Sequence, residues 1–243
     1  MLTLVIGNKE LSSWSLRPWL VLKHFDIEFR EVQLPLDTPE FFAQIVRYSG
    51  AMRVPVLLEG DAHIWDSLAI VEYLNEKVGG RAWPGDPLLR AHARSVSAEM
   101  HSGFMALRQT WPMHATGSNP HVPLSPEGRA DVARVQAIWA DCRKKYRTLG
   151  PWLFGEFSIA DAMYAPVVLR FRHYGAKDLS ADSQAYMQQW LQSTRACARP
   201  AATAACTPAS PHSDPSLRSG GSAAPPAHTS HPVSYTHLTL PTN

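Results

Sequence analysis

The sequence changes its pattern at a short turn-rich segment, residues 83–87 (WPGDP). Before this segment, short strand-like runs alternate with helical stretches, whereas residues 87–194 contain only helical patterns. Proline and glycine at this density interrupt regular structure and are typical of a connection between domains. The pattern therefore predicts one domain over residues 1–80, a linker over 81–87 and a second domain over 88–194.

The first domain has the predicted order β-α-β-α-β-β-α. The strands are expected at residues 2–6, at 28–34 and, as a hairpin with a Gly-Asp turn, at 54–65. The helices are expected from about residue 15 to 26, from 38 to 46 and from 66 to 79. A hairpin that follows two strand–helix units implies a mixed four-stranded sheet covered by helices.

The second domain is predicted to be all-helical. The helices are expected at about residues 88–111, 125–146, 158–174 and 183–193. Ser158 followed three residues later by Asp161 forms a short capping box, which marks the start of the third of these helices.

The sequence changes character again at about Arg195, after which proline, alanine, serine and threonine replace any apolar periodicity. We interpret residues 195–243 as a disordered, non-native tail produced by a frameshift near Ser193. The four histidines of this tail have irregular spacing and predict no metal site.

Charge and cysteine content limit the possible partners. Acidic and basic residues balance up to residue 194, and the net charge of +2 arises beyond it, so neither nucleic acid nor an anionic membrane is expected as a partner. No apolar run reaches the length of a membrane span, and the first residues lack the basic region of a signal peptide. The three cysteines form neither a C-x-x-C motif nor a metal-ligand spacing. These features predict a cytoplasmic protein without a bound metal.

The segment from Ser12 to Arg17 (SSWSLR) joins a buried strand to the start of a helix. Unpaired backbone N–H groups and the helix dipole favour a negative charge at such a point. A serine hydroxyl placed there can donate a hydrogen bond to a thiolate and so favour the ionised thiol. The alternative is that these serines only cap the helix.

Two further segments of the first domain can bind polar groups. Val54-Pro55 precedes a strand, and a cis bond there would leave the backbone of Val54 free to pair with an extended peptide. An ordinary trans proline at the start of an edge strand is the alternative. Asp66 and Ser67 begin a helix, where the hydroxyl and first N–H groups can hold a carboxylate and the Asp66 carboxylate an ammonium. Capping is the simpler role for this pair.

These three segments, in this order and spacing, resemble the glutathione S-transferase superfamily over about residues 2–194. The resemblance implies an α/β, thioredoxin-like N-terminal domain and an all-α C-terminal domain. It also implies that Val54-Pro55 is the family's cis-proline loop and that Asp66-Ser67 holds the γ-glutamyl end of glutathione. Residues 152–161 are similar to the family's folding signature, which assigns Asp161 to structure.

The first segment is similar to the zeta-class pattern Ser-Ser-Cys-Ser-x-Arg, with Trp14 in place of the cysteine. This likeness implies that Ser12 activates the thiol, with Ser13 as the close competitor, and that Arg17 is a positive neighbour of the site. The expected function is transfer of glutathione, as co-substrate, to a small apolar electrophile. A glutathione-dependent cis–trans isomerase acting on maleylacetoacetate and a non-catalytic binding protein remain as alternatives.

The electrophile's pocket is expected between the two domains. Trp14 is a candidate for its wall, and His101, Met105 and Arg108 recur at helical spacing on the first helix after the linker. Packing and solvation are the simpler roles for Met105 and Arg108. The superfamily resemblance further implies a homodimer.

Overall fold

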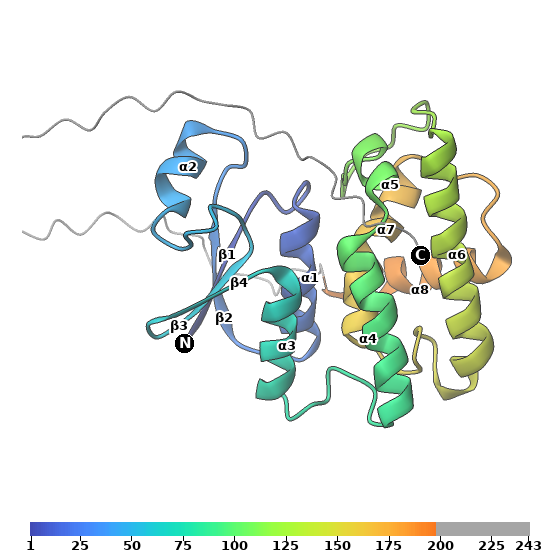
Figure 1. Ribbon diagram of the computed structural model, residues 1–243, viewed down its shortest axis with the longest axis horizontal. Helices are drawn as coiled ribbons and strands as arrows, with labels where there is room; N and C mark the ends of the chain where they lie inside the picture. Colours follow the sequence, from blue (N-terminus) through green and yellow to red (C-terminus); the bar gives the residue numbers. More distant parts are fainter. Residues whose placement is uncertain (198–243) are drawn as a thin grey trace, which may run out of the picture. The chain divides into compact units, whose positions relative to one another are not determined.

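The computed structural model describes residues 1–197, with side chains up to residue 193. Four strands form one mixed sheet in the order β2-β1-β3-β4 (Figure 1). The central strand β1 pairs in parallel with β2 and antiparallel with β3, and β4 pairs antiparallel with β3. The strands are β1 (Leu2–Ile6), β2 (Phe29–Gln33), β3 (Val56–Glu59) and β4 (Ala62–Trp65). The predicted mixed sheet and its hairpin are confirmed.

Helices cover both faces of this sheet because successive side chains of a strand point to opposite sides. Leu4 and Leu57 belong to the core shared with α1 (Ser13–His24) and α3 (Ser67–Lys77). Val5 and Val56 belong instead to a smaller cluster with α2 (Pro39–Ile45), on the opposite face (Figure 1). The thioredoxin-like arrangement predicted for the first domain is therefore confirmed.

The rest of the described chain is helical. Helix α7 lies at its centre, is buried along almost its whole length, and packs against α1, α4 and α8. Its predicted capping box between Ser158 and Asp161 is present. The helices of this half are α4 (Pro87–Ser102), α5 (Met105–Thr110), α6 (Pro126–Tyr146), a 3-10 turn η1 (Arg147–Leu149), α7 (Ile159–His173) and α8 (Ala181–Cys197).

The sheet and the helical half share one hydrophobic core, which contains Leu4 of β1 as well as Val167 of α7. The linker takes part in this packing: Trp83 is buried, and the N–H of Ile159 donates to the carbonyl of Ala82 over 2.9 Å. We retain the division at residues 81–87 as a proposed domain boundary.

One predicted helix is wrong. The pattern over 88–111 predicts a single helix, but the chain breaks at Gly103, whose backbone is extended, and at Phe104, which is left-handed at φ 60°. A side chain at Gly103 would lie 2.8 Å from the carbonyl oxygen of Glu99. The break buries Phe104, and the Arg108 guanidinium donates to the carbonyls of Met100 and His101 at the end of α4. Burial and capping thus outweigh the local preference to continue the helix.

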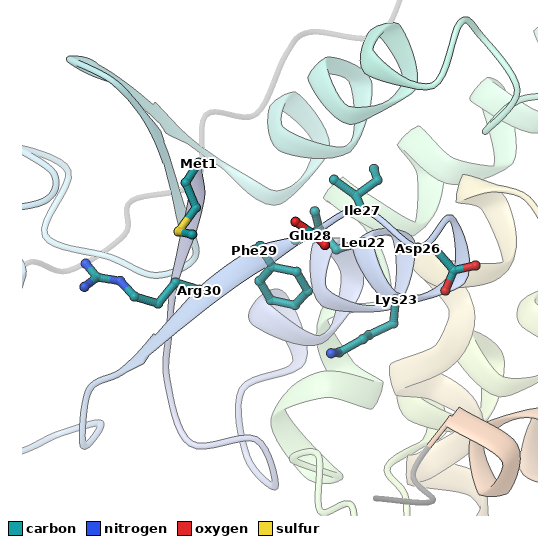
Figure 2. Close-up of a pocket in the computed structure, with 8 residues that line it drawn as sticks. All are labelled: Met1, Leu22, Lys23, Asp26, Ile27, Glu28, Phe29 and Arg30. Atoms are coloured by element: carbon teal, nitrogen blue, oxygen red, sulfur yellow. The ribbon is translucent and has the colours of Figure 1, made fainter. Parts of the chain in front are cut away.

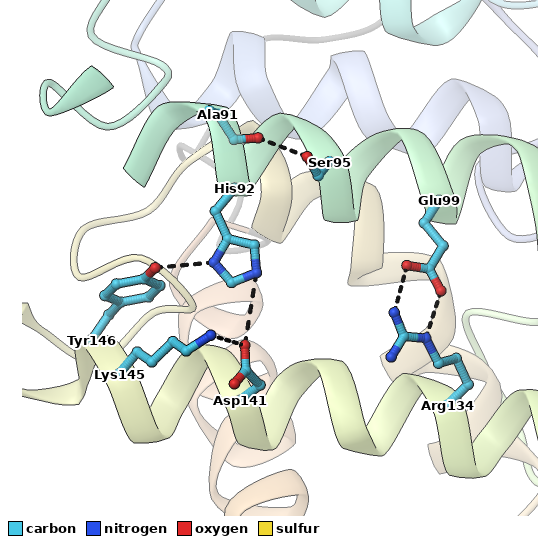
Figure 3. Close-up of polar contacts among 8 residues, drawn as sticks. All are labelled: Ala91, His92, Ser95, Glu99, Arg134, Asp141, Lys145 and Tyr146. Atoms are coloured by element: carbon cyan, nitrogen blue, oxygen red, sulfur yellow. Dashed lines mark hydrogen bonds and ion pairs between the residues drawn. The ribbon is translucent and has the colours of Figure 1, made fainter. Parts of the chain in front are cut away.

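Polar pairs join α4 to α6 on the outer side of the helical half (Figure 3). Arg134 forms two parallel hydrogen bonds with Glu99, at 2.7 and 2.9 Å. His92 contacts the Tyr146 hydroxyl and lies 3.8 Å from Asp141. These exposed pairs orient the two helices and contribute little stability each.

The last helix, α8, is longer than expected and extends to Cys197. The disorder predicted from residue 195 is therefore wrong for residues 195–197. The remainder of the predicted non-native tail, residues 198–243 with their histidines, lies outside the described residues. Within the described part, no helix combines the length and apolarity needed to cross a membrane.

Candidate functional site

A cleft of about 480 Å³ contains most of the residues that the sequence singled out. It lies where the end of β4, the loop before β3 and the start of α1 meet the C-terminal end of α4. The predicted residues on its walls are Trp14, Val54, Pro55, Asp66, Ser67 and His101. The cleft also includes three residues that sequence reasoning missed, Ala51, Arg53 and Trp65. Arg53 could have been found, because it directly precedes Val54-Pro55, whereas nothing in the sequence distinguishes Trp65.

The Val54–Pro55 peptide bond is cis, which decides between the two alternatives left by the sequence. Val54 lies just outside β3, and among the described residues its backbone N–H and C=O form no backbone–backbone hydrogen bond. Since Val54 lines the cleft, its backbone groups lie at the cleft wall without a backbone partner. An added peptide strand can pair with backbone groups of this kind.

Asp66 caps helix α3. Its Oδ1 atom accepts from the N–H of Leu68 at 2.8 Å and of Ala69 at 3.4 Å, while Oδ2 lies 3.3 Å from Nε2 of His101. The hydrogen bond with His101, together with those backbone donors, lowers the pKa of Asp66. Asp66 also has a φ of 73°, which is uncommon for a residue with a side chain. The expected cap is confirmed, and the carboxylate remains ionised at neutral pH.

Ser67 differs from its neighbour, because its hydroxyl has no partner. The side chain is 1% exposed, and its Oγ forms no hydrogen bond within the described residues. Six buried polar side-chain atoms in the described part lack a partner, and four of them belong to Ser67, His101 and Arg17, in or beside the cleft. Buried polar groups are almost always paired in folded proteins. Their concentration here indicates a place where a polar ligand completes the hydrogen bonding.

The serines of the first segment form a hydrogen-bonded chain at the start of α1. The N–H of Gly7 donates to Ser15 Oγ at 3.2 Å, and the hydroxyls of Ser15 and Ser12 lie 2.8 Å apart. Ser12 is the N-cap, accepts from the N–H of Ser15 at 3.3 Å, and is 7% exposed. Ser13 is the first residue of α1 and is half-buried. Neither serine is among the residues that line the cleft, although Ser13 directly precedes Trp14, which does.

Trp14 lies against two cations and a histidine. The guanidinium carbons of Arg17 and Arg108 are 4.5 and 4.8 Å from the centre of its ring, and the His101 ring packs edge-on at 5.2 Å. Arg17 is 2% exposed, and burial, with Arg108 and Arg170 nearby, lowers its pKa well below the usual value. Arg17 and Arg108 thus pack against Trp14, which lines the cleft, and are not lining residues themselves.

Met105 does not lie on the same face as the other candidates. It is 53% exposed, and the break at Gly103 and Phe104 puts it on a different helix from His101. The prediction that His101, Met105 and Arg108 share one face of a single helix is therefore wrong. Arg108 nevertheless reaches Trp14 from α5.

Other hollows lack the predicted residues. One, of about 600 Å³, lies beside the C-terminal end of α1 and the start of β2, where Lys23 stands over the ring of Phe29 (Figure 2). A second, of about 510 Å³, lies in the helical half over the stacked rings of Trp111 and Tyr174. None of the unpaired buried polar atoms of the described residues belongs to the lining of either hollow. Among the described residues, no three His, Cys, Asp or Glu side chains are grouped so that they could hold a metal ion.

Comparison with known proteins identifies the N-terminal part of the chain. Residues 11–77 match the family model described as "Glutathione S-transferase, N-terminal domain". A probable maleylacetoacetate isomerase of Caenorhabditis elegans is 36% identical over 96 residues, which cover 39% of this chain and 44% of that protein. Glutathione S-transferase 1 of Dianthus caryophyllus is 41% identical over 80 residues, which cover 32% of each. The chain thus matches less than half the length of these curated relatives.

Solved structures extend the likeness to the helical half. A glutathione transferase homologue from Burkholderia, with bound glutathione, superimposes with a TM-score of 0.58 at 21% identity, over 80% of this chain and 98% of the other. The Tau class glutathione S-transferase of the mango Mangifera indica gives a TM-score of 0.58 at 20% identity, over 82% and 89%. At these identities the likeness establishes the fold. Residues 11–77 are thus similar to the N-terminal domain of glutathione S-transferases, and the described residues have the fold of these solved structures.

Proposed function

We propose that this protein is a glutathione transferase, which binds glutathione in the 480 Å³ cleft and activates its thiol for attack on a small electrophile. One observation carries the proposal: the same cleft contains two polar groups that lack a partner among the described residues. They are the backbone of Val54 and the buried hydroxyl of Ser67. The solved structure of the Burkholderia relative, which holds glutathione, supports the choice of ligand.

The chemistry of the cleft matches the groups of the tripeptide. The free backbone of Val54 suits the central peptide of glutathione, as in strand addition. Ser67 Oγ, at the positive end of the α3 dipole, suits the α-carboxylate of the γ-glutamyl residue. Asp66 remains ionised, because its pKa is lowered, and suits the ammonium next to that carboxylate.

We propose that Ser12 activates the thiol, with Ser13 as the competitor. In the structure Ser12 Oγ donates to Ser15 Oγ, which also accepts from the N–H of Gly7, and Ser12 Oγ accepts from the N–H of Ser15. To stabilise a thiolate, the Ser12 hydroxyl would turn its proton from Ser15 towards the sulfur. Hydroxyl protons reorient freely between such partners. Each unit by which the pKa of the thiol falls stabilises the thiolate by about 1.4 kcal/mol and yields about tenfold more of it near pH 7.

Conjugation of 1-chloro-2,4-dinitrobenzene tests this function. The thiolate sulfur forms a bond with the chlorine-bearing ring carbon, chloride leaves with the bonding electrons, and the thiol proton passes to solvent. Replacing Ser12 by Ala is expected to lower kcat/KM at pH 7 by about tenfold or more and to shift the rate profile to higher pH. Ser125→Ala, which removes a remote N-cap of α6, is the matched control and leaves the rate unchanged.

An unchanged rate and pH profile in Ser12→Ala would reject Ser12 as the activating residue. If Ser13→Ala then shows the loss, the role passes to Ser13. Absence of any conjugation by the unaltered chain, together with no calorimetric binding of glutathione, would reject the transferase proposal and favour a non-catalytic binding protein.

Isomerisation is the second candidate, because the Caenorhabditis elegans relative bears the name of a probable maleylacetoacetate isomerase. The same activated thiolate would add to the double bond and leave again, so glutathione is regenerated. Turnover of maleylacetoacetate with catalytic amounts of glutathione separates the two activities.

We also propose that the protein is a cytoplasmic homodimer. The resemblance to the glutathione S-transferase superfamily supports the dimer, and the cysteine pattern supports the location. Light scattering at micromolar concentration tests the dimer, and fractionation of the native host tests the location.

A further inference from the structure

His101 reaches two walls of the cleft from the helical half. It lies in the last turn of α4 and lines the cleft together with Trp14 and Asp66. Its Nε2 atom lies 3.3 Å from Oδ2 of Asp66, and its ring packs edge-on against Trp14 at a centroid distance of 5.2 Å. The side chains of His101 and Asp66 are 24% and 46% exposed, so a ligand in the cleft can reach this pair.

The two oxygens of Asp66 have different partners. Oδ1 accepts from the N–H groups of Leu68 and Ala69 and so caps α3. Oδ2 contacts Nε2 of His101, which must be the donor because an ionised carboxylate can only accept. A carboxylate has about four lone-pair positions, and these three donors occupy all but about one of them. The remaining position, on Oδ2, is left for a donor of the ligand.

The fold does not depend on this contact. Helices α3 and α4 are already joined by Glu72 and Arg94, which form two hydrogen bonds at 3.2 and 3.3 Å. The end of α4 is capped by Arg108, which donates to two of its last carbonyls. A partly exposed contact such as that between His101 and Asp66 contributes about 1 kcal/mol or less to stability. The contact therefore serves the cleft more than the fold.

A donor on Oδ2 fixes the plane of the Asp66 carboxylate and thus the direction of its remaining lone pair. This direction matters for binding an ammonium, because a hydrogen bond weakens steeply when donor and acceptor are misaligned. Hydrogen bonds between charged groups are about twice as strong as neutral ones, so misalignment costs correspondingly more here. The other ring nitrogen of His101, Nδ1, has no partner among the described residues, which leaves Asp66 as the polar group that the ring contacts.

We propose that His101 is a positioning residue for glutathione, which holds Oδ2 of Asp66 in the direction that binds the ammonium of the γ-glutamyl residue. The helical half of the chain thereby takes part in recognising this end of the tripeptide. This role rests on the proposed transferase function. It assigns to glutathione a residue that was predicted from the sequence to line the electrophile's pocket.

Two peptides that differ only in the amino group test this role. Glutathione carries the ammonium, whereas glutaryl-cysteinyl-glycine has hydrogen in its place. Calorimetry on the unaltered chain should show glutathione binding about tenfold more tightly, because the analogue leaves Oδ2 of Asp66 without its donor. His101→Ala should weaken the binding of glutathione by about fivefold to tenfold and leave that of the analogue unchanged. In turnover, the same variant should raise KM for glutathione with kcat unchanged.

Further substitutions separate the hydrogen bond from the packing of the ring. The amide nitrogen of Gln lies near the place of Nε2, so His101→Gln should retain most of the preference for glutathione over the analogue. The shorter Asn does not reach Asp66, so His101→Asn should behave like His101→Ala. His92→Ala is the matched control, since His92 lies on the same helix and contacts Tyr146 and Asp141, away from the cleft (Figure 3). Equal losses for both peptides in His101→Ala, or the same selective loss in His92→Ala, would overturn the role.

A measurement without any peptide checks the contact itself. The hydrogen bond with His101 is the largest cause of the lowered pKa of Asp66. In a carbon-13 NMR titration of the carboxyl groups, His101→Ala should therefore raise the pKa of Asp66 towards its ordinary value, and His92→Ala should leave it in place. An unchanged pKa of Asp66 in His101→Ala would overturn the role.

The binding results also separate this role from the transferase function. If the unaltered chain binds glutathione but His101→Ala shows no selective loss, His101 is not a positioning residue and the transferase function stands. If the unaltered chain binds neither peptide, both proposals are rejected. Circular dichroism of each variant verifies that it is folded.

Discussion

The start of α7 and the start of α3 use similar residues in opposite ways. At α7, Asp161 accepts from the N–H groups of Leu153 and Ser158, and from the hydroxyls of Ser158 and Tyr186. At α3, Asp66 is likewise a cap, but the adjoining Ser67 hydroxyl has no partner within the described chain. Both serines are buried, so exposure does not explain the difference.

The polar groups at the start of α7 stabilise the fold, whereas those at the start of α3 are available to a ligand. A serine and an aspartate at a helix start can satisfy each other and their buried neighbours, as they do at α7. The same residue types beside a cleft leave donors open. Since an unpaired buried group costs about 1–3 kcal/mol, it is retained where a ligand repays that cost.

The largest expected effect is on the closed network. Replacing Asp161 by Ala leaves the donors of Leu153, Ser158 and Tyr186 unpaired at a fully buried position. The free energy of unfolding should fall by about 3–5 kcal/mol, as for other broken buried networks. Urea denaturation measures it. A loss below about 1 kcal/mol would show that the network is not closed in solution.

A smaller effect is expected from pH, and its sign differs between the two aspartates. Burial raises the pKa of Asp161 to about 6, against hydrogen bonds that favour the carboxylate. The folded state then binds more protons than the unfolded state between about pH 4 and 6, so stability falls as pH rises through that window, by at most about 3 kcal/mol.

The lowered pKa of Asp66 works the other way: its contribution is present above the unfolded pKa and is lost as pH falls through the folded value. Denaturation curves at stepped pH values measure both effects. Asp161→Asn should remove the change in the free energy of unfolding between pH 4 and 6, whereas Asp66→Asn should retain it. The reverse pattern would contradict the assignment of the two carboxylates.

The smallest expected effect is on the open site. Ser67→Ala should weaken glutathione binding by about tenfold, or about 1.4 kcal/mol, while leaving the stability of the free protein unchanged or slightly higher. Ser97→Ala is the matched control, because Ser97 of α4 is also buried with an unpaired hydroxyl but does not line the cleft. Calorimetry and thermal unfolding measure the two quantities. Equal losses of affinity in both variants would reject Ser67 as a ligand of glutathione.

Local chemistry made much of the fold predictable. Neighbouring residues decide the alternation of strands and helices and the hairpin turn at Gly60. They also decide the helix caps at Ser12 and Asp66. The site could be predicted only in part. Val54 and Ser67 were found from motifs, but the proximity of Arg170 to Arg17 depends on how α7 packs against α1.

The sequence alone determined the order of the elements in the first domain and the mixed sheet, because caps, turns and periodicity act over a few residues. Only the tertiary structure decided where the helix pattern over 88–111 breaks, since the burial of Phe104 and the capping by Arg108 involve contacts outside the local pattern. It also decided which polar groups remain unpaired. Pairing is a property of the whole packed molecule, and that property distinguishes the cleft from the core.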